Sequence, residues 1–420
     1  MQANPKETPP AINSERLWAT IHALAEIGAT KNGGVTRLAF TDEDRAGRAF
    51  FVAACRAIGM AIERDAFGNL FAVSPDRDGE TSAPSVVVGS HLDSQAAGGK
   101  YDGAYGVMCG LEIARALHES GTRLAAPFEI AVWANEEGAR FAPPMMGSGV
   151  FSGVFELDEM LDKHDKDGVS IREEIARDAP LKDIPHRPDR PIKAYFEPHI
   201  EQGPILEAEG VHIGIVQSAQ AVRWLDLEIT GFQAHAGPTP MNLRKDALLA
   251  ASECALAAEA IAREQAPHGR ATCGVLRIRD ASRNVIPGAV ELSVDMRHPN
   301  DSVLESMIGE LEKRCAEIGA SRGVSIKSTP VWTMKAVKFD ERLVSALRAA
   351  AEARQVRSID MVSGAGHDAL YVARRWPAAM IFTPCGDGVS HNEAESMTRD
   401  DAALACQVTL DAILPLLTNR

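Results

Sequence analysis

Four short polar segments combine histidine with carboxylate side chains. They are Gly89 to Asp93 with the nearby Asp102, Asn135 to Gly138, Phe196 to Gly203, and Ser390 to Glu393. Imidazole and carboxylate ligands without a thiolate suit Zn²⁺, Mn²⁺, Co²⁺ or Ni²⁺. One aspartate shared between two such ions, about 3.5–4 Å apart, would form a two-metal hydrolytic site.

Two pairs of neighbouring residues predict separate roles at such a site. His91 and Asp93 lie two residues apart, so within a strand they would face the same side. Asp93 could therefore orient the imidazole of His91 or a neighbouring loop. Glu136 and Glu137 are adjacent and point in different directions, which suits one metal ligand beside one general base.

Apolar runs next to these segments predict the strands that position them. Residues 86–88 and 128–133 are apolar enough for strands buried on both faces, and a further strand is expected at 378–384. Residues 103–118 have helical spacing between the first two. This order predicts a mixed or parallel sheet wrapped by helices, in which ligands gather beyond the carboxyl ends of the strands. We therefore expect one metal site at one edge of the sheet.

The pattern changes from about residue 210. An alternating strand near 225–230 is followed by an alanine-rich helix at 244–264, strands near 275–278 and 290–296, a helix near 303–311 and a strand at 324–328. This β-α-β-β-α-β order predicts a small ferredoxin-like domain. After Pro330 the alternation of helix and strand returns, with a helix near 342–354. The simplest interpretation is a catalytic domain of residues 1–213 and 333–420, interrupted by an inserted α+β domain of residues 214–332.

Composition excludes several classes of protein. The 420 residues carry a net charge of −14, which argues against a nucleic-acid partner. The sequence contains no run of 18 or more uncharged apolar residues, so it predicts no membrane span. Residues 1–10 are polar and lack the apolar stretch of a secretory signal. Seven cysteines without a CxxC pair predict free thiols in a reducing compartment, so we expect a cytoplasmic, multidomain protein.

Six ordered motifs resemble the hydantoinase/carbamoylase branch of the M20 metallohydrolases over essentially the whole chain. They are Gly89-Ser90-His91-Leu92-Asp93-Ser94, Tyr101-Asp102-Gly103, Asn135-Glu136-Glu137-Gly138-Ala139-Arg140-Phe141, His199-Ile200-Glu201-Gln202-Gly203-Pro204, Ser363-Gly364-Ala365-Gly366-His367-Asp368-Ala369 and Ser390-His391-Asn392. The branch includes N-carbamoyl-L-amino-acid hydrolases, β-ureidopropionases, and allantoate and ureidoglycolate amidohydrolases. The peptidase branch separates the ligands at His91 and Asp102 much further, and often has a carboxylate where this chain has His199.

The resemblance implies two divalent ions per chain, with Zn²⁺ as the first choice. His91, Asp102 and His199 would surround one ion. Asp102, Glu137 and His391 would hold the other, so that Asp102 bridges the two. Glu136 would be the general base, and Asp93 would orient residues behind the metal ligands.

The resemblance also implies how substrate is held. His235 matches the oxyanion-binding histidine, and Asn284 and Arg297 match substrate-carboxylate binders. Gln202 and Gly366 are further substrate-binding candidates. The insert would act as a lid and as the interface of a homodimer, across which its histidine can reach the partner's active site.

Other interpretations of single residues stay open at this point. Arg297 could form a salt bridge on a strand face, and Asn284 could be a turn residue. Gly364 to Gly366 suggest close approach of the backbone to a ligand, whereas His367 and Asp368 could simply start a helix.

We therefore expect a binuclear metal-dependent amidohydrolase that cleaves an N-carbamoyl amino acid to the amino acid, ammonia and carbon dioxide. Hydrolysis of allantoate or ureidoglycolate is the alternative within the same chemistry. A metallopeptidase fits the motif spacing less well. A non-catalytic binding homologue would have no use for a general base at Glu136.

Overall fold

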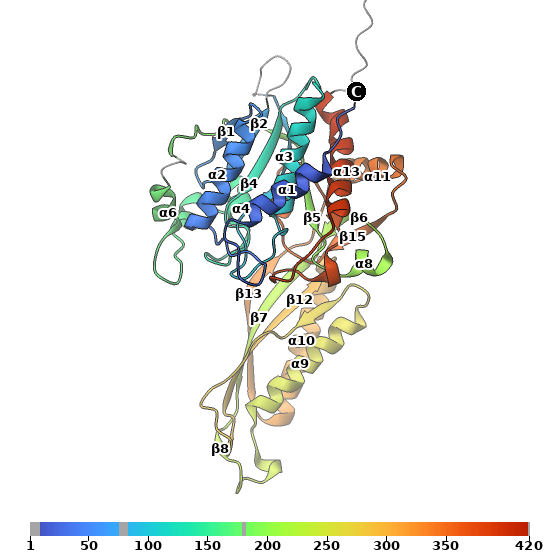
Figure 1. Ribbon diagram of the computed structural model, residues 1–420. Coiled ribbons are helices and arrows are strands. Elements are labelled where there is room, and N and C mark those ends of the chain that lie inside the picture. Colours follow the sequence, from blue (N-terminus) through green and yellow to red (C-terminus); the bar gives the residue numbers. More distant parts are fainter. Residues whose placement is uncertain (1–8, 75–82, 179–181, 419–420) are drawn as a thin grey trace, which may run out of the picture. The chain divides into compact units, whose positions relative to one another are not determined.

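The computed structural model describes residues 9–74, 83–178 and 182–418 (Figure 1). The chain divides into two compact units, residues 1–217 with 338–420 and residues 218–337. The junctions expected at 213/214 and 332/333 fall inside two continuous strands, β6 (Ile213–Ala219) and β13 (Ser325–Met334). The expectation about a secretory signal falls mainly on residues 1–8, outside the described residues.

The larger unit is built on a nine-stranded mixed sheet. Its strands are β1 (Ala61–Arg64), β2 (Leu70–Ser74), β3 (Ser85–His91), β4 (Phe128–Trp133), β5 (Ile192–Ile200), β6, β14 (Val337–Lys338), β15 (Ser358–Ser363) and β16 (Ala378–Thr383). Their order is β1-β2-β4-β3-β5-β16-β6-β14, with β15 paired to β6. The four central strands β4, β3, β5 and β16 run parallel to one another, so their carboxyl ends meet at one edge.

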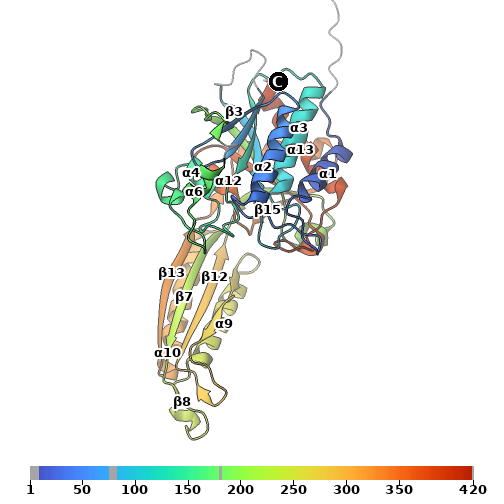
Figure 2. The same cartoon turned by 60° about the vertical axis from the view of Figure 1, so that its left-hand side comes forward.

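Helices cover this sheet (Figures 1 and 2). The helices of the larger unit are α1 (Ser14–Ala25), α2 (Asp42–Arg56), α3 (Ala104–Glu119), α4 (Met146–Phe151), α5 (Leu157–Leu161), α6 (Ile171–Arg177), α8 (Ile205–Glu209), α11 (Glu341–Ala353), α12 (Asp368–Val372) and α13 (Arg399–Thr418). Every residue of β3, β4 and β16 is buried, which requires cover on both faces. The expected α/β fold with a helix-covered mixed sheet is therefore confirmed.

A buried ion-pair cluster anchors β4, the strand that leads to Glu136. Glu129 has no exposed side-chain surface and accepts hydrogen bonds from Arg187 Nε at 3.0 Å and Arg187 Nη2 at 3.1 Å. Arg190, also fully buried, contacts Glu129 and lies 2.5 Å from Glu63 Oε2. Two arginines thus depend on one carboxylate in the middle of the sheet.

The smaller unit has the strand order β10-β12-β7-β13, with all neighbours antiparallel. Its elements are β7 (Ala221–Thr230), β8 (Ala234–His235), α9 (Ala247–Glu264), β9 (Arg270–Thr272), β10 (Leu276–Ile278), β11 (Val285–Ile286), β12 (Ala289–His298), α10 (Asp301–Arg322) and β13. Along β7, Leu225, Leu227 and Ile229 are buried and alternate with exposed residues. They pack with α9 and α10, which confirms the ferredoxin-like α+β insert.

The last strand of the insert is longer than the sequence pattern indicated. We expected it at 324–328, with a break at Pro330, but β13 continues to Met334. The pairing with β7 shifts its register between Pro330 and Trp332. Since β13 lies at the edge of its sheet, a bulge there tolerates a proline that donates no hydrogen bond.

One described helix, α13, is long and apolar enough to cross a membrane by length and composition alone. Of its apolar window, 56% is buried inside the protein. It packs against α1, α11 and β16, as a core helix does.

The Glu129 cluster generates a stability prediction. Glu129→Ala should lower the free energy of unfolding by roughly 3–5 kcal/mol, because it leaves two buried guanidinium groups without their shared acceptor. Chemical denaturation followed by circular dichroism measures this. Arg172→Ala is the control, since Arg172 pairs with Asp158 and Asp162 at the surface, and its midpoint should not move. Equal shifts for the two variants would contradict the importance of the buried cluster.

Candidate metal centre

The carboxyl ends of the four parallel strands bring the five expected metal ligands together. His91 is the last residue of β3, and His199 is the penultimate residue of β5. Glu137 follows β4, and His391 lies in the loop after β16. Asp102 lies just before α3, in the connection that leaves β3. The polar segments therefore share one edge of the sheet, as their positions after apolar runs predict.

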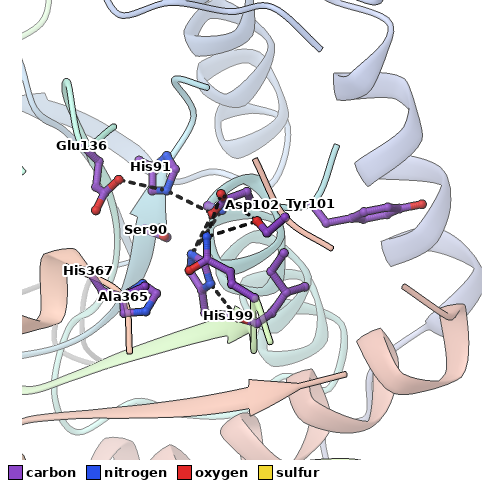
Figure 3. Close-up of polar contacts among 12 residues, drawn as sticks. Ser90, His91, Tyr101, Asp102, Glu136, His199, Ala365 and His367 are labelled. Atoms are coloured by element: carbon purple, nitrogen blue, oxygen red, sulfur yellow. Dashed lines mark hydrogen bonds and ion pairs between the residues drawn. The ribbon is translucent and has the colours of Figure 1, made fainter. Parts of the chain in front are cut away.

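Asp102 lies at the middle of this group, and its two carboxylate oxygens face different histidines. Oδ1 is 3.2 Å from His199 Nε2 and 3.7 Å from His91 Nε2 (Figure 3). Oδ2 is 3.2 Å from His391 Nε2. A single buried carboxylate thus takes part in two separate sets of ligands.

The two buried histidines are oriented by backbone carbonyl groups. His91 Nδ1 lies 2.8 Å from the carbonyl oxygen of Asp93, and His199 Nδ1 lies 2.9 Å from that of Ile200. These contacts fix Nδ1 as the protonated nitrogen and leave Nε2 as the available ligand atom. Metal-binding histidines commonly have this arrangement.

Glu137 completes the second set. Its Oε2 is 3.4 Å from His391 Nε2, and Gln95 donates to both oxygens from its backbone N–H and its side-chain amide. His91, Asp102 and His199 offer ligand atoms within 4.8 Å of one another, as do Asp102, Glu137 and His391. The donor chemistry and the shared carboxylate fit divalent metal ions.

A glycine makes room for this arrangement where α3 begins. Gly103 has φ = 62°, and a Cβ atom there would overlap the imidazole ring of His91. Any larger residue would push the imidazole away from Asp102. Only glycine meets both the backbone and the space requirement.

Glu136 lies beside the first set of ligands, with Oε2 3.5 Å from His91 Nε2. The preceding Asn135 has a left-handed backbone (φ = 55°), which turns the chain sharply after β4. Glu136 and Glu137 therefore diverge, and only Glu137 faces His391.

The side chain of Asp93 orients the loop, whereas its backbone carbonyl is the group that orients the imidazole of His91. Its two carboxylate oxygens accept hydrogen bonds from the backbone N–H groups of Glu136 and Glu137, each at 3.2 Å. The predicted strand face shared by Asp93 and His91 was wrong, because β3 ends at His91. The Asp93 carboxylate makes the second expected contact, the one with a neighbouring loop.

Burial and mutual repulsion disturb the carboxylates of the site. Burial, followed by the nearby Asp368 and Glu137, raises the pKa of Glu136 well above its ordinary value. Burial and Asp102 raise the pKa of Glu137 to about 8, against the opposing effect of His391. Burial also opposes ionisation of Asp102, but hydrogen bonds with His199 and His391 hold its pKa well below the usual range.

The histidines respond in different ways. The hydrogen bond with Asp102 raises the pKa of His391 to about 9. Burial lowers the pKa of His199, but the hydrogen bond with Asp102 outweighs this effect and raises the pKa to about 9. Burial lowers the pKa of His91. In the metal-free protein, protons on His199 and His391 therefore balance the charge of Asp102.

Two of the expected substrate-binding residues lie at this edge. Gln202 has φ = 57°, and its Nε2 donates to Asp102 Oδ2 at 2.9 Å. Its Oε1 is buried and accepts no hydrogen bond from the described residues, so it can accept one from a ligand. Gly366 packs against Met145, whose Cε would lie 3.0 Å from a Cβ atom at position 366.

The other expected substrate binders lie in the insert. His235 is exposed in β8, and its Nδ1 accepts a hydrogen bond from the backbone N–H of Gly237. Asn284 lies beside it, since its carbonyl accepts from the N–H of Ala236 at 2.8 Å. Arg297 lies in β12, where its Nη2 is 2.6 Å from Asp295 Oδ2. The structure thus shows the strand-face salt bridge that the sequence left open for Arg297.

Several buried residues of the site were not predicted from the sequence. His367 is the residue before α12, 2% exposed, and its ring centre is 4.4 Å from that of His199, so the helix start and the site coincide. Glu197, two residues before His199, accepts from Ser90 Oγ at 2.8 Å. Asp368 and Glu395 are also buried. The signal available for them was position, because Glu197, His367 and Asp368 lie within the quoted segments and Glu395 follows the last of them.

Comparisons with known proteins agree with this geometry. The profile of Peptidase family M20/M25/M40 matches residues 87–414. An N-carbamoyl-L-amino-acid amidohydrolase of Rhizobium meliloti is 40% identical over 96% of both chains. An allantoate amidohydrolase of Bacillus subtilis is 34% identical over 94% of this chain and 96% of that one.

Solved structures extend the likeness to the fold. The crystal structure of an amidase of the hydantoinase/carbamoylase family from Burkholderia multivorans has a TM-score of 0.93 and 45% identity, and covers 98% of this chain and 99% of that one. The match spans both units of the chain. The chain therefore belongs to the M20/M25/M40 family of metallohydrolases, in its hydantoinase/carbamoylase branch.

Proposed function

We propose that this protein is an amidohydrolase that cleaves the ureido group of an N-carbamoyl-L-amino acid, releasing the amino acid, ammonia and carbon dioxide. The observation that carries the proposal is the placement of Asp102 between two ligand sets, with Glu136 beside them. The similarity to the Rhizobium meliloti amidohydrolase supports the choice of substrate class.

The proposed cofactor is a pair of divalent ions, with Zn²⁺ as the first choice and Mn²⁺, Co²⁺ or Ni²⁺ as alternatives. His91, Asp102 and His199 would hold one ion, and Asp102, Glu137 and His391 the other. When bound, the ions would polarise the ureido carbonyl, a poor electrophile, and make water a better nucleophile at neutral pH.

Glu136 is the proposed general base. It would accept a proton from the attacking water and give it to the departing nitrogen, so that one carboxylate serves both halves of the reaction. Asp93 would keep Glu136 in place through the hydrogen bond that its carboxylate accepts from the backbone N–H of Glu136. Gln202 Oε1 would accept a hydrogen bond from a ureido N–H, which suits its buried, available oxygen. Gly366 would let the substrate approach the backbone.

The insert supplies the remaining proposed contacts. His235 would donate a hydrogen bond to the developing oxyanion. Asn284 and Arg297 would bind the substrate carboxylate, which the planar guanidinium matches. Arg297 must then share or release Asp295, so part of its interaction energy with the substrate is offset by the loss of that ion pair.

A homodimer is proposed because the insert separates these contacts. Thr230 pairs with Ala289 at one end of β12, close to β8 and His235, whereas Val222 pairs with Arg297 eight residues further along. At about 3.3 Å per residue this is roughly 26 Å, too far for both side chains of one insert to grip one small substrate. A second copy could supply His235 and Asn284. The exposed groove of about 780 Å³ beside Leu256 and Leu276 offers apolar surface for such an interface.

A cytoplasmic location is part of the proposal. All seven cysteines are free, including Cys254 and Cys315, whose sulfur atoms are 3.5 Å apart and unbonded. Unbonded thiols at this separation fit a reducing compartment.

Metal loading should depend on pH in a defined direction. Ligands bind metal in their deprotonated form, and Glu137 has a pKa of about 8 and His199 and His391 one of about 9 without metal. Apparent affinity should therefore rise from about pH 6 to about pH 9, with protons released on binding. Calorimetric titration in two buffers of different ionisation enthalpy measures this. Saturation at one ion per active chain would contradict the two-metal proposal.

The two adjacent glutamates should fail in different ways. Glu136→Gln should keep both ions, and its kcat should fall by about 10²–10⁴-fold, since the substitution removes only the proton carrier. Glu137→Gln should weaken metal binding, because it removes a ligand. Metal analysis and steady-state kinetics on the same preparations separate the two effects. Metal loss in Glu136→Gln together with full loading of Glu137→Gln would mean that the roles are reversed.

Allantoate is the second candidate substrate, favoured by the Bacillus subtilis relative. Ammonia release from a panel of N-carbamoyl-L-amino acids, allantoate and ureidoglycolate decides between them. The proposed function requires the highest kcat/KM on an N-carbamoyl-L-amino acid.

Arg297→Lys tests recognition of the substrate carboxylate. The variant keeps the charge but loses the two-pronged geometry, so KM for the N-carbamoyl amino acid should rise about 10-fold or more. The matched control is the decarboxylated analogue, an alkyl urea. It should be a poor substrate that does not distinguish the variant from the wild type. Equal losses on both compounds would show that Arg297 serves the Asp295 salt bridge and not the substrate.

A further inference from the structure

Glu395 is a buried carboxylate with no role in the mechanism above. It lies four residues after His391 and is 5% exposed. Its Oε1 accepts hydrogen bonds from the backbone N–H groups of Tyr101 at 2.9 Å and Asp102 at 3.1 Å. Its Oε2 accepts from Ser390 Oγ at 2.9 Å. One side chain therefore joins the turn that carries Asp102 to the loop that carries His391.

The absence of a side chain at Gly99 leaves the space that this carboxylate occupies. A Cβ atom on Gly99 would overlap the Glu395 carboxylate, so any other residue at 99 would displace it. A buried carboxylate near Asp102 is also costly, because two negative charges share a region of low dielectric. Packing alone would be better served by an apolar side chain. The charge and the hydrogen-bond acceptors themselves must therefore be what this position requires.

The position of the Ser390 proton shows what Glu395 does for Asp102. Ser390 Oγ is 2.9 Å from Glu395 Oε2 and 3.3 Å from Asp102 Oδ2. A hydroxyl has one proton to donate. While Ser390 donates to Glu395, it cannot also donate to Asp102 Oδ2. That oxygen lies 3.2 Å from His391 Nε2 and already accepts a hydrogen bond from Gln202 Nε2 at 2.9 Å. Without a second donor it keeps its remaining lone pair for a cation.

The His391 loop also needs an anchor. His391 has a left-handed backbone (φ = 54°), and about half of its side chain is exposed. Glu393 holds the outer side of the loop through Asn32 Nδ2 at 2.7 Å and Thr30. Glu395 holds the inner side, where the ligand atoms lie.

We propose that Glu395 is a positioning residue for the metal site formed by Asp102, Glu137 and His391. It fixes the Asp102 turn against the His391 loop and draws the Ser390 proton away from Asp102 Oδ2. This inference rests on the proposed role of these three residues as metal ligands.

Titration of metal-stripped protein with Mn²⁺ and with Zn²⁺ tests the proposal. The wild type should bind two ions. Glu395→Ala should weaken one of the two sites by about 10–100-fold, the range found for residues behind metal ligands, and leave the other within a few-fold of the wild type. Glu112→Ala is the matched control, because Glu112 is a fully buried carboxylate of α3 whose partners are Arg16, Arg115 and the backbone N–H of Asn13. It should lower thermal stability without changing either affinity.

Two further variants separate anchoring from proton placement. Glu395→Gln keeps an oxygen for the backbone N–H groups, so it should fold and melt like the wild type. Its amide would donate to Ser390, whose proton would then turn to Asp102 Oδ2 and weaken the same site. Adding Ser390→Ala to Glu395→Gln removes that proton and should restore most of the lost affinity.

The outcomes are distinguishable. Wild-type protein that binds fewer than two ions overturns the proposed two-metal function and this inference with it. Two ions in the wild type, with unchanged affinities in Glu395→Ala and Glu395→Gln, overturns the inference alone. Weakened binding that Ser390→Ala does not restore would reject the proton placement and leave only the anchoring.

Discussion

The concentration of buried carboxylates around Asp102 is the constraint on which the rest of the site depends. Asp93, Glu136, Glu137, Glu197 and Glu395 all lie at the same sheet edge, largely removed from water. Burial, followed by the repulsion between these neighbouring charges, raises the pKa values of several of them. The fold tolerates this arrangement because backbone N–H groups and histidines face the oxygens. Divalent cations would supply the remaining positive charge.

Satisfying that constraint requires strained loops at the ends of regular strands. Asn135, Gln202 and His391 are non-glycine residues with positive φ, and each lies in a segment that carries a ligand or substrate-binding residue. Such conformations cost of order 1–3 kcal/mol each and persist only where the surroundings determine them. Here side chains fix them: Asn135 Nδ2 donates to Phe141, and both Gln202 and His391 contact Asp102. These turns let Glu136, Gln202 and His391 reach the ligand group, which an unstrained continuation of the strands would not do.

The sequence predicted the parts of this arrangement that follow from periodicity. Apolar runs predict buried strands, and parallel strands end at one edge, so His91, Glu137, His199 and His391 could be placed together from the sequence alone. Glu395 could not be found this way, because a single glutamate in a polar loop looks like any solvated acid. The contact of Asp93 depended on where β3 ends, and a one- or two-residue change in a strand end alters which group a side chain meets. The boundaries between the two units, at 217/218 and 337/338, were similarly hidden, since they fall inside the strands β6 and β14.

The division of the chain into two units has a consequence for specificity. The larger unit holds every proposed metal ligand and the general base, which act on the ureido group that all candidate substrates share. Relatives named for N-carbamoyl amino acids and for allantoate cover the same length of chain, so the fold as a whole does not select between these substrates. In the proposed function, selection comes from side chains that would meet the rest of the substrate, such as Arg297 and Asn284 in the insert. Arg297 already has Asp295 as a partner. A substrate carboxylate is therefore favoured only if its interaction with Arg297 is stronger than the ion pair that it replaces. Discrimination then depends on a difference between two similar interactions, and small changes around β12 could redirect the enzyme within its branch without altering the metal centre.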